Sequence, residues 1–126
     1  MKLSDRLEAV ASMVSKGKTL ADVGTDHAFI PIKLVEESII PDALAMDIGE
    51  GPLLRARQHI SEHGLKDRIE TRISDGLDRY DKGEAGTILL AGMGGDLIIS
   101  ILTRGIEKIQ LGDEIIVSPH THPESV

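Results

Sequence analysis

The apolar positions of the chain follow two alternating patterns. Short runs of consecutive apolar residues, typical of buried strands, predict strands at 19–23, 43–48, 69–73, 86–91 and 114–117. Between them, apolar residues recur every three or four positions, which predicts helices from Ser4 to about Gly17 and over 28–38, 50–63 and 96–104. Because the strands alternate with helices and are largely apolar, the sequence predicts an α/β fold, a mostly parallel sheet with helices on both faces.

Length and composition fit one cytoplasmic domain spanning residues 1–126. No apolar run reaches the roughly 18 residues of a membrane span, and the first residues lack the apolar centre of a signal peptide. The absence of cysteine excludes disulfides and a cysteine nucleophile. A net charge of -7 argues against a generic nucleic-acid-binding surface but is compatible with a local basic patch. With Phe29 and Tyr80 as its aromatic residues, the chain has little from which to build base-stacking platforms.

The turn after the first strand, Gly24-Thr25-Asp26-His27, carries candidate binding chemistry. A glycine there lets the backbone approach a ligand. The spacing departs from the dinucleotide fingerprint G-x-G-x-x-G, because Asp26 and Phe29 occupy the later glycine positions. Asp26 would repel a pyrophosphate but suits the ammonium and sulfonium groups of S-adenosylmethionine. Alternatively, Asp22 and Asp26 only cap the helix and order the turn.

Further carboxylates stand at the ends of the next two strands. Asp47, at the end of the second, is placed to accept hydrogen bonds from both hydroxyls of an adenosine ribose, with Glu50 as a rival. Asp75, followed by Gly76 and Leu77, ends the third and could meet the adenine amino group, although Asp-Gly is also a common turn. Open parallel sheets bind ligands at the carboxyl ends of their strands, so these acidic strand ends point to one site.

The loop after the fourth strand, Ala91-Gly92-Met93-Gly94-Gly95, is the most specific signal. Three glycines around one methionine leave the backbone open to a flat or charged ligand, whereas a simple tight turn needs one or two. The Asn/Asp-Pro-Pro-aromatic motif of many amino-directed methyltransferases is absent, which argues against an exocyclic amino group as methyl acceptor. The candidate cofactor-binding residues are Asp22, Gly24, Thr25, Asp47, Ile48, Asp75, Gly76, Leu77, Ala91, Gly92, Met93 and Gly94.

Four segments together, at 3–7, 21–31, 74–77 and 91–95, resemble the bacterial tRNA adenine-N1 methyltransferases of the TrmK type. The resemblance spans nearly the whole chain. It implies a Rossmann-like class I methyltransferase fold, S-adenosylmethionine as methyl donor and N1 of adenine 22 in tRNA as acceptor. The family carries a further helical C-terminal domain, which this chain is too short to hold, so the resemblance implies a domain truncated at its C-terminus.

The resemblance also suggests catalytic residues. Asp26 and His27 are expected next to the methionine end of the donor, and Arg6 on the first helix is a candidate phosphate or base contact. N1 of neutral adenine is already nucleophilic, so a protein group is needed only to take a proton from the exocyclic amine or to stabilise the charge of the methylated ring. Alternatively, His27 orders the turn and Arg6 pairs with a surface acid.

No metal site is predicted. His120 and His122 lie on a loop without a nearby third ligand, which makes a poor zinc site. His59 and His63 lie one helical turn apart, but their helix face also carries Arg55 and is expected to be solvated. Two other functions fit parts of the pattern, a nicotinamide dinucleotide-binding Rossmann domain and a cofactor-binding domain without activity of its own.

Overall fold

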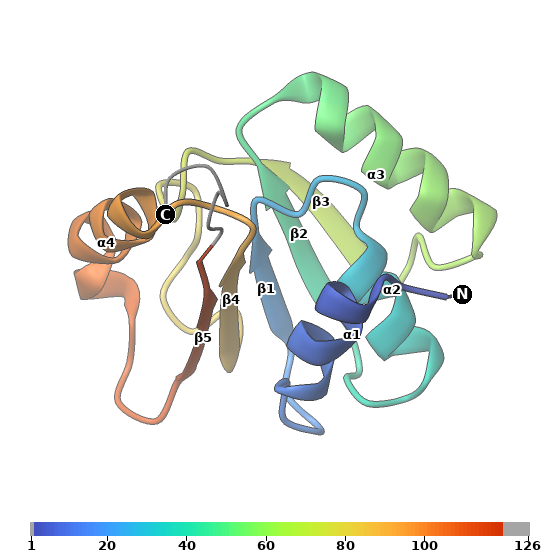
Figure 1. Cartoon of the computed structure of the whole chain (residues 1–126), viewed down its shortest axis with the longest axis horizontal. Coiled ribbons are helices and arrows are strands. Elements are labelled where there is room, and N and C mark those ends of the chain that lie inside the picture. Colours follow the sequence, from blue (N-terminus) through green and yellow to red (C-terminus); the bar gives the residue numbers. More distant parts are fainter. Residues whose placement is uncertain (1, 120–126) are drawn as a thin grey trace.

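The computed structural model describes residues 2–119, and its centre is a parallel sheet of five strands (Figure 1). The strands are β1 (Leu20–Val23), β2 (Ala43–Asp47), β3 (Ile69–Ile73), β4 (Thr87–Ala91) and β5 (Glu114–Ser118). They lie in the order β3-β2-β1-β4-β5, and every neighbouring pair is parallel. The chain therefore winds outward in two directions from β1, and the strand order reverses between β1 and β4, where such sheets form a ligand crevice.

Within residues 2–119, the strands alternate with four α-helices and one short 3₁₀ turn. These are α1 (Asp5–Ser12), α2 (Phe29–Glu36), α3 (Glu50–Glu62), α4 (Gly95–Arg104) and η1 (Ile106–Lys108). The predicted mostly parallel α/β fold is confirmed, and every predicted strand and helix is present within a few residues of its expected bounds. The single turn η1 was not predicted, because three residues are too few to show a periodicity.

The first two helices differ from the prediction at their ends. Ser4 caps α1 as expected, its hydroxyl accepting a bond of 3.3 Å from the Leu7 N–H, but the helix stops at Ser12 instead of near Gly17. There the chain leaves the helix, and the Gly17 N–H pairs with the Ile39 carbonyl at 2.8 Å. In α2, Ala28 is the cap in a left-handed conformation, so the helix begins one residue later than predicted.

Alternate residues of the strands enter two separate cores. On one face, strand residues such as Leu20, Ala45 and Leu89 pack with α1, α2 and α3. On the other face, Val23, Met46 and Leu90 pack with α4 and the segment between β3 and β4. Both faces of the central strands are thus covered, which explains why their sequences are largely apolar.

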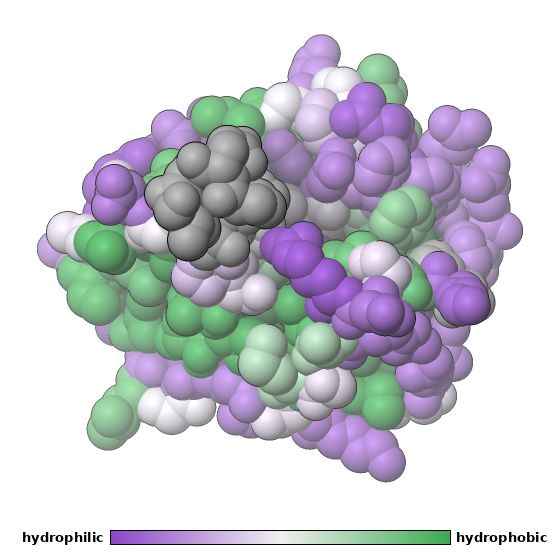
Figure 2. Space-filling view, viewed as in Figure 1, coloured by the Kyte–Doolittle hydropathy of each residue, from purple (hydrophilic) through white to green (hydrophobic). Residues whose placement is uncertain are grey.

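Apolar side chains gather on the surface near β5 and α4 (Figure 2). Ile99 of α4 is 65% exposed, and Val117 of the edge strand β5 is 44% exposed. Among the helices of residues 2–119, none combines the length and the apolar character that a membrane-spanning segment needs.

The end of α4 provides a test of the second core. A Cβ added at Gly105 would lie 2.7 Å from Leu77 Cδ1 and 2.9 Å from Leu77 Cβ, whereas one added at Gly95 meets no atom within 4 Å. We expect Gly105→Ala to lower the free energy of unfolding by about 1–3 kcal/mol through overpacking. Gly95→Ala, at the other end of the helix, should leave it unchanged or raise it by up to about 1 kcal/mol. Urea unfolding of both variants measures the difference, and equal losses would contradict the packing argument.

Candidate functional site

The carboxyl ends of β1, β2 and β4 meet at one edge of the sheet, as expected for parallel strands. A crevice of about 380 Å³ opens there against the first turn of α1. This volume lies within the range of small-molecule sites. The residues that line the crevice are Arg6, Leu7, Asp22, Gly24, Thr25, Asp26, His27, Phe29, Ile30, Ala91 and Gly92. The structure therefore brings together all three predicted catalytic candidates and five of the predicted cofactor-binding residues.

The turn between β1 and α2 is held in an unusual conformation. Gly24, Asp26 and Ala28 all have positive φ angles, of 76°, 55° and 62°. The N–H groups of Gly24 and Thr25 both donate to the carbonyl of Met46 in β2, at 2.9 and 2.8 Å. Left-handed conformations are unfavourable for residues with a Cβ, so strain at Asp26 and Ala28 is maintained by the surrounding bonds. Strained turns of this kind are typical of ligand-binding sites.

Asp22 places a buried carboxyl group in the wall of the crevice. The residue is 5% exposed, and the Thr25 hydroxyl donates to its Oδ2 at 2.7 Å. Burial raises the pKa of Asp22 from 3.8 to about 6, the Thr25 bond lowers it, and the negative charge of Asp47 raises it further. At neutral pH the group is ionised and poorly solvated. An ionised carboxylate in such a place is stabilised by a cationic ligand.

Asp47 connects the end of β2 to the first turn. Its Oδ2 accepts a bond of 2.9 Å from the N–H of Asp26, and its Oδ1 accepts from the N–H groups of Ile48 and Gly49 at 2.9 and 3.4 Å. Ile48 itself is 67% exposed at the sheet edge. The predicted ribose contact is therefore bonded directly to the turn that carries Asp26.

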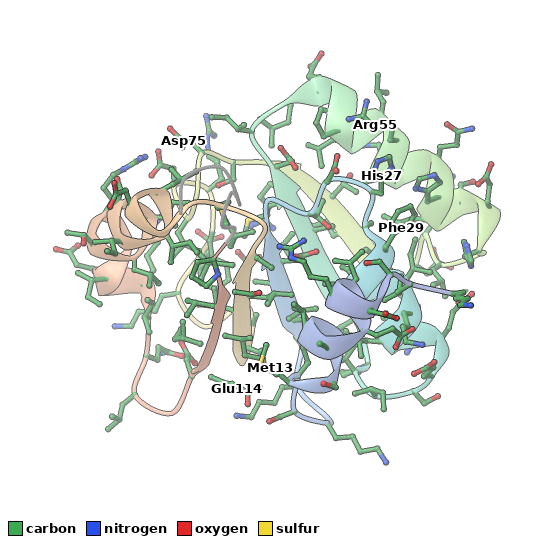
Figure 3. The ribbon with its side chains drawn as sticks, in the orientation of Figure 1. Met13, His27, Phe29, Arg55, Asp75 and Glu114 are labelled. Atoms are coloured by element: carbon green, nitrogen blue, oxygen red, sulfur yellow. The ribbon has the colours of Figure 1, made fainter. Side chains whose placement is uncertain are left out.

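The carboxylate of Asp26 is exposed and lies between two side chains. Its Oδ1 is 3.4 Å from Nη2 of Arg55 in α3, and its Oδ2 is 3.7 Å from Nε2 of His27. Sequence reasoning missed Arg55 as a partner, because nothing in the spacing of α3 shows which of its faces meets the first turn. Figure 3 shows Arg55 and His27 on the same side of the molecule, with Arg55 on α3.

His59 is also nearer the site than the sequence indicates. Its helix face was expected to be solvated, but the residue is half-buried, and its Nδ1 lies 3.0 Å from the backbone carbonyl of His27. Because a carbonyl only accepts, His59 Nδ1 carries the proton in this bond. Its neighbour His63 contacts Glu36 instead, at 2.6 Å. The two histidines one turn apart therefore make different contacts.

The glycine-rich loop after β4 closes the opposite side of the crevice. Gly92 has a φ of 77°, and a Cβ added there would lie 3.5 Å from Nη2 of Arg6 in α1. A Cβ added at Gly24 would lie 3.8 Å from Sδ of Met93, so this methionine faces the first turn. Gly94 is the extended residue that caps α4. Small residues here let the loop, the turn and Arg6 approach one another.

Asp75, the third predicted ligand contact, does not line the crevice, although its turn lies at the same edge of the sheet. The N–H of Ser74 donates to the Asp47 carbonyl at 2.9 Å, which places the turn after β3 at the same sheet edge. Asp75 is exposed and 3.5 Å from Nη2 of Arg104 in α4 (Figure 3). The Leu77 side chain is 2% exposed in the second core, and a Cβ at Gly76 would lie 2.9 Å from Cγ1 of Ile101. Leu77 could thus contact a ligand only through its main chain.

Within residues 2–119, no group of three or more acidic or histidine side chains is arranged to hold a metal ion. The predicted loop histidines, His120 and His122, lie outside the described residues.

Comparison with known proteins identifies the family. Residues 3–126 match the family described as "Methyltransferase domain". The chain is 40% identical over 122 residues to the tRNA (adenine(22)-N(1))-methyltransferase of Bacillus subtilis (strain 168), covering 97% of this chain and 51% of that protein. The chain thus spans about half the length of the curated relative it matches.

Solved structures agree with this comparison. The crystal structure of the B. subtilis M1A22 tRNA methyltransferase TrmK superposes with a TM-score of 0.90 at 41% identity, covering 94% of this chain and 50% of that one. Streptococcus pneumoniae Sp1610, a putative tRNA (m1A22) methyltransferase in complex with S-adenosyl-L-methionine, gives a TM-score of 0.88 at 41% identity, covering 98% and 58%. The resemblance seen in the sequence motifs is confirmed, and the chain belongs to the methyltransferase domain family.

Proposed function

We propose that this chain is the S-adenosylmethionine-binding domain of an enzyme that methylates N1 of adenine 22 in tRNA. The observation that carries the proposal is the crevice itself, in which a buried carboxyl group, a strained turn and a glycine-rich loop converge. It is supported by the sequence and structural similarity to proteins with that activity.

The residues present fit S-adenosylmethionine better than a dinucleotide. Its ammonium and sulfonium groups are cationic, and the crevice presents Asp22 and Asp26 to them. A pyrophosphate would meet the same carboxylates and would be repelled. This difference separates the proposal from the alternative of a nicotinamide dinucleotide-binding domain.

Different residues of the chain would contact different parts of the ligand. Asp47 would accept hydrogen bonds from the ribose hydroxyls, and exposed Ile48 would cover the adenine ring, with Asp75 near its amino group. Main-chain groups of Gly24, Thr25 and the loop from Ala91 to Gly94 would hold the methionine end. When bound, S-adenosylmethionine supplies an electrophilic methyl group.

In the reaction the protein would align the methyl donor with the acceptor and stabilise the positive charge that forms on the adenine ring. N1 of adenine provides the lone pair, so the site must hold acceptor and donor in line and keep water out. Asp26 and His27 lie at the crevice wall, where they would stabilise the positive ring or take the proton of the exocyclic amine. Arg55 holds the Asp26 carboxylate beside the opening, and Arg6 would contact the base or a phosphate.

Titration calorimetry with S-adenosylhomocysteine and with NAD tests the cofactor part of the proposal. We expect S-adenosylhomocysteine to bind in the micromolar range and NAD to give no measurable heat. Circular dichroism confirms that the protein is folded. A folded chain that fails to bind S-adenosylhomocysteine would refute the proposal, and binding of NAD would favour the dinucleotide alternative.

A methyl-transfer assay on unmodified tRNA transcripts, with mapping of the modified base, tests the acceptor. We expect the methyl group at N1 of adenine 22. If the chain binds S-adenosylhomocysteine but transfers no methyl group, while a protein of the relatives' length does, the chain is a cofactor-binding domain without activity of its own.

A further inference from the structure

Aromatic rings are scarce in this chain, and their placement is uneven. The sequence holds one phenylalanine, one tyrosine and no tryptophan. Tyr80 is fully buried, and its hydroxyl accepts a bond from the N–H of Ala85 at 2.9 Å and contacts the carbonyl of the same residue at 3.2 Å. Tyr80 therefore supports the segment between β3 and β4 and is closed to ligands. Phe29 is left as the one large aromatic ring that a ligand could reach.

Phe29 lies in a cluster with two imidazoles, His27 and His59, which we call the ring cluster. The centroids of His27 and Phe29 are 4.8 Å apart and their planes differ by 7°. His59 lies 5.2 Å from His27 and 5.0 Å from Phe29, at 28° and 24°. The three rings are thus close to parallel, and the bond from His59 Nδ1 to the His27 carbonyl fixes the orientation of the third.

Two members of the ring cluster, His27 and Phe29, line the crevice. They do so together with the apolar residues Leu7 and Ile30, and Asp22 and Asp26 are the carboxylates in the same lining. The lining of the crevice therefore combines carboxylates suited to a cation with apolar and ring side chains suited to a flat molecule. Figure 3 shows His27 and Phe29 close together at the α3 side, far from Asp75.

We propose that Phe29, supported by His27 and His59, is the surface on which the acceptor adenine stacks. This inference rests on the proposed function and adds how the acceptor is held. Every base has a π-face, and stacking of a base on an aromatic side chain contributes substantially to binding. A purine offers more ring area than a pyrimidine, so the surface favours adenine over uracil. Near-parallel rings held from behind by α3 would also fix the plane of the base and the direction of its N1 lone pair.

The single phenylalanine makes the contact directly observable. The probes are two RNA pentanucleotides, UUAUU and UUUUU, titrated into the protein in the presence of saturating S-adenosylhomocysteine. We expect the ring protons of Phe29 to shift upfield in the NMR spectrum with UUAUU and to move much less with UUUUU. Unshifted Phe29 signals at saturating UUAUU would overturn the inference, whatever the behaviour of any variant.

Substitution at Phe29 measures the size of the effect. Phe29→Leu keeps an apolar side chain but removes the ring, and we expect it to weaken UUAUU binding roughly 5- to 100-fold. Phe29→Tyr keeps an aromatic ring and therefore the stacking contact. We expect its affinity for UUAUU to lie within about threefold of that of the original protein. UUAUU binding by Phe29→Leu that equals the original would also overturn the inference.

Binding of S-adenosylhomocysteine by the same variants separates this inference from the proposed function. The proposed donor contacts come from carboxylates and main-chain groups and not from the Phe29 side chain. We therefore expect the affinity for S-adenosylhomocysteine to change less than threefold in Phe29→Leu, and thermal unfolding shows whether the variant is folded. If the unsubstituted chain does not bind S-adenosylhomocysteine, the proposed function is wrong. If the chain binds S-adenosylhomocysteine but UUAUU does not contact Phe29, only the inference about the stacking surface is wrong.

Discussion

Replacing Asp47 with alanine is expected to weaken S-adenosylhomocysteine binding roughly 100-fold or more. Hydrogen bonds to a charged group contribute about 1.5–3 kcal/mol each, and the proposed ribose contact involves two hydroxyls. The substitution also removes the acceptor for the N–H groups of Asp26 and Ile48, so the strained first turn keeps its two bonds to the Met46 carbonyl but loses the bond that holds Asp26 to β2. Titration calorimetry measures the change in affinity.

Two further variants show whether the affinity depends on a carboxylate at position 47 or only on the net charge of the protein. Asp47→Glu keeps a carboxylate and should bind within about tenfold of the original. Asp67→Ala makes the same change in net charge, but Asp67 precedes β3 at the opposite end of the sheet and should leave binding unaffected. If Asp47→Ala binds as well as Asp67→Ala, Asp47 is not a ligand contact.

Replacing Asp22 with asparagine is expected to stabilise the protein at neutral pH while weakening its ligand binding. Burial raises the pKa of Asp22 in the folded protein to about 6, above its ordinary 3.8. The folded state therefore binds this proton more tightly than the unfolded state. The stability associated with the protonated group is fully present below pH 3.8 and is lost as the pH rises from there through about 6. Above pH 6 the loss amounts to about 3 kcal/mol. Asparagine keeps an oxygen that accepts from Thr25 and carries no charge.

The measurement is the difference in unfolding free energy between Asp22→Asn and the original protein as a function of pH. We expect this difference to grow in favour of the variant by about 2 kcal/mol between pH 4.5 and 7.5. Because both proteins share every other titrating group, those contributions largely cancel. A difference that does not change with pH would show that Asp22 titrates normally.

The two effects of Asp22→Asn have one cause. A carboxylate that destabilises the folded protein at neutral pH is retained at functional sites where its charge is used. We therefore expect the variant that is more stable at pH 7.5 to bind S-adenosylhomocysteine less tightly. A variant that gained stability and kept its affinity would place the cationic part of the ligand elsewhere.

The sequence predicted the strands and the edge at which the site forms because both depend on local patterns. Buried apolar runs identify parallel strands, and parallel strands place their carboxyl ends at one edge. Gly24, Asp47 and Gly92 could thus be assigned to one edge of the sheet without knowledge of the strand order. The predicted end of α1 near Gly17 was wrong, because the bond between Gly17 and Ile39 joins segments that no periodicity connects.

The side-chain partners within the site could not be predicted. Arg55 and His59 lie on α3, and they reach Asp26 and His27 only because this helix packs with one face toward the first turn. A sequence period shows which face of a helix is apolar, but not which neighbour its half-buried polar residues meet. His59 was expected in solvent for that reason.

By itself the sequence determined the strand–helix alternation, the family motifs and the residues at the strand ends, because each of these depends only on residues close together along the chain. Only the tertiary structure decided that Asp22 is buried enough to shift its pKa, and that Phe29 stands beside two imidazoles. Burial and ring contacts depend on how separate elements pack, and packing distances between α2 and α3 are not encoded in either segment alone.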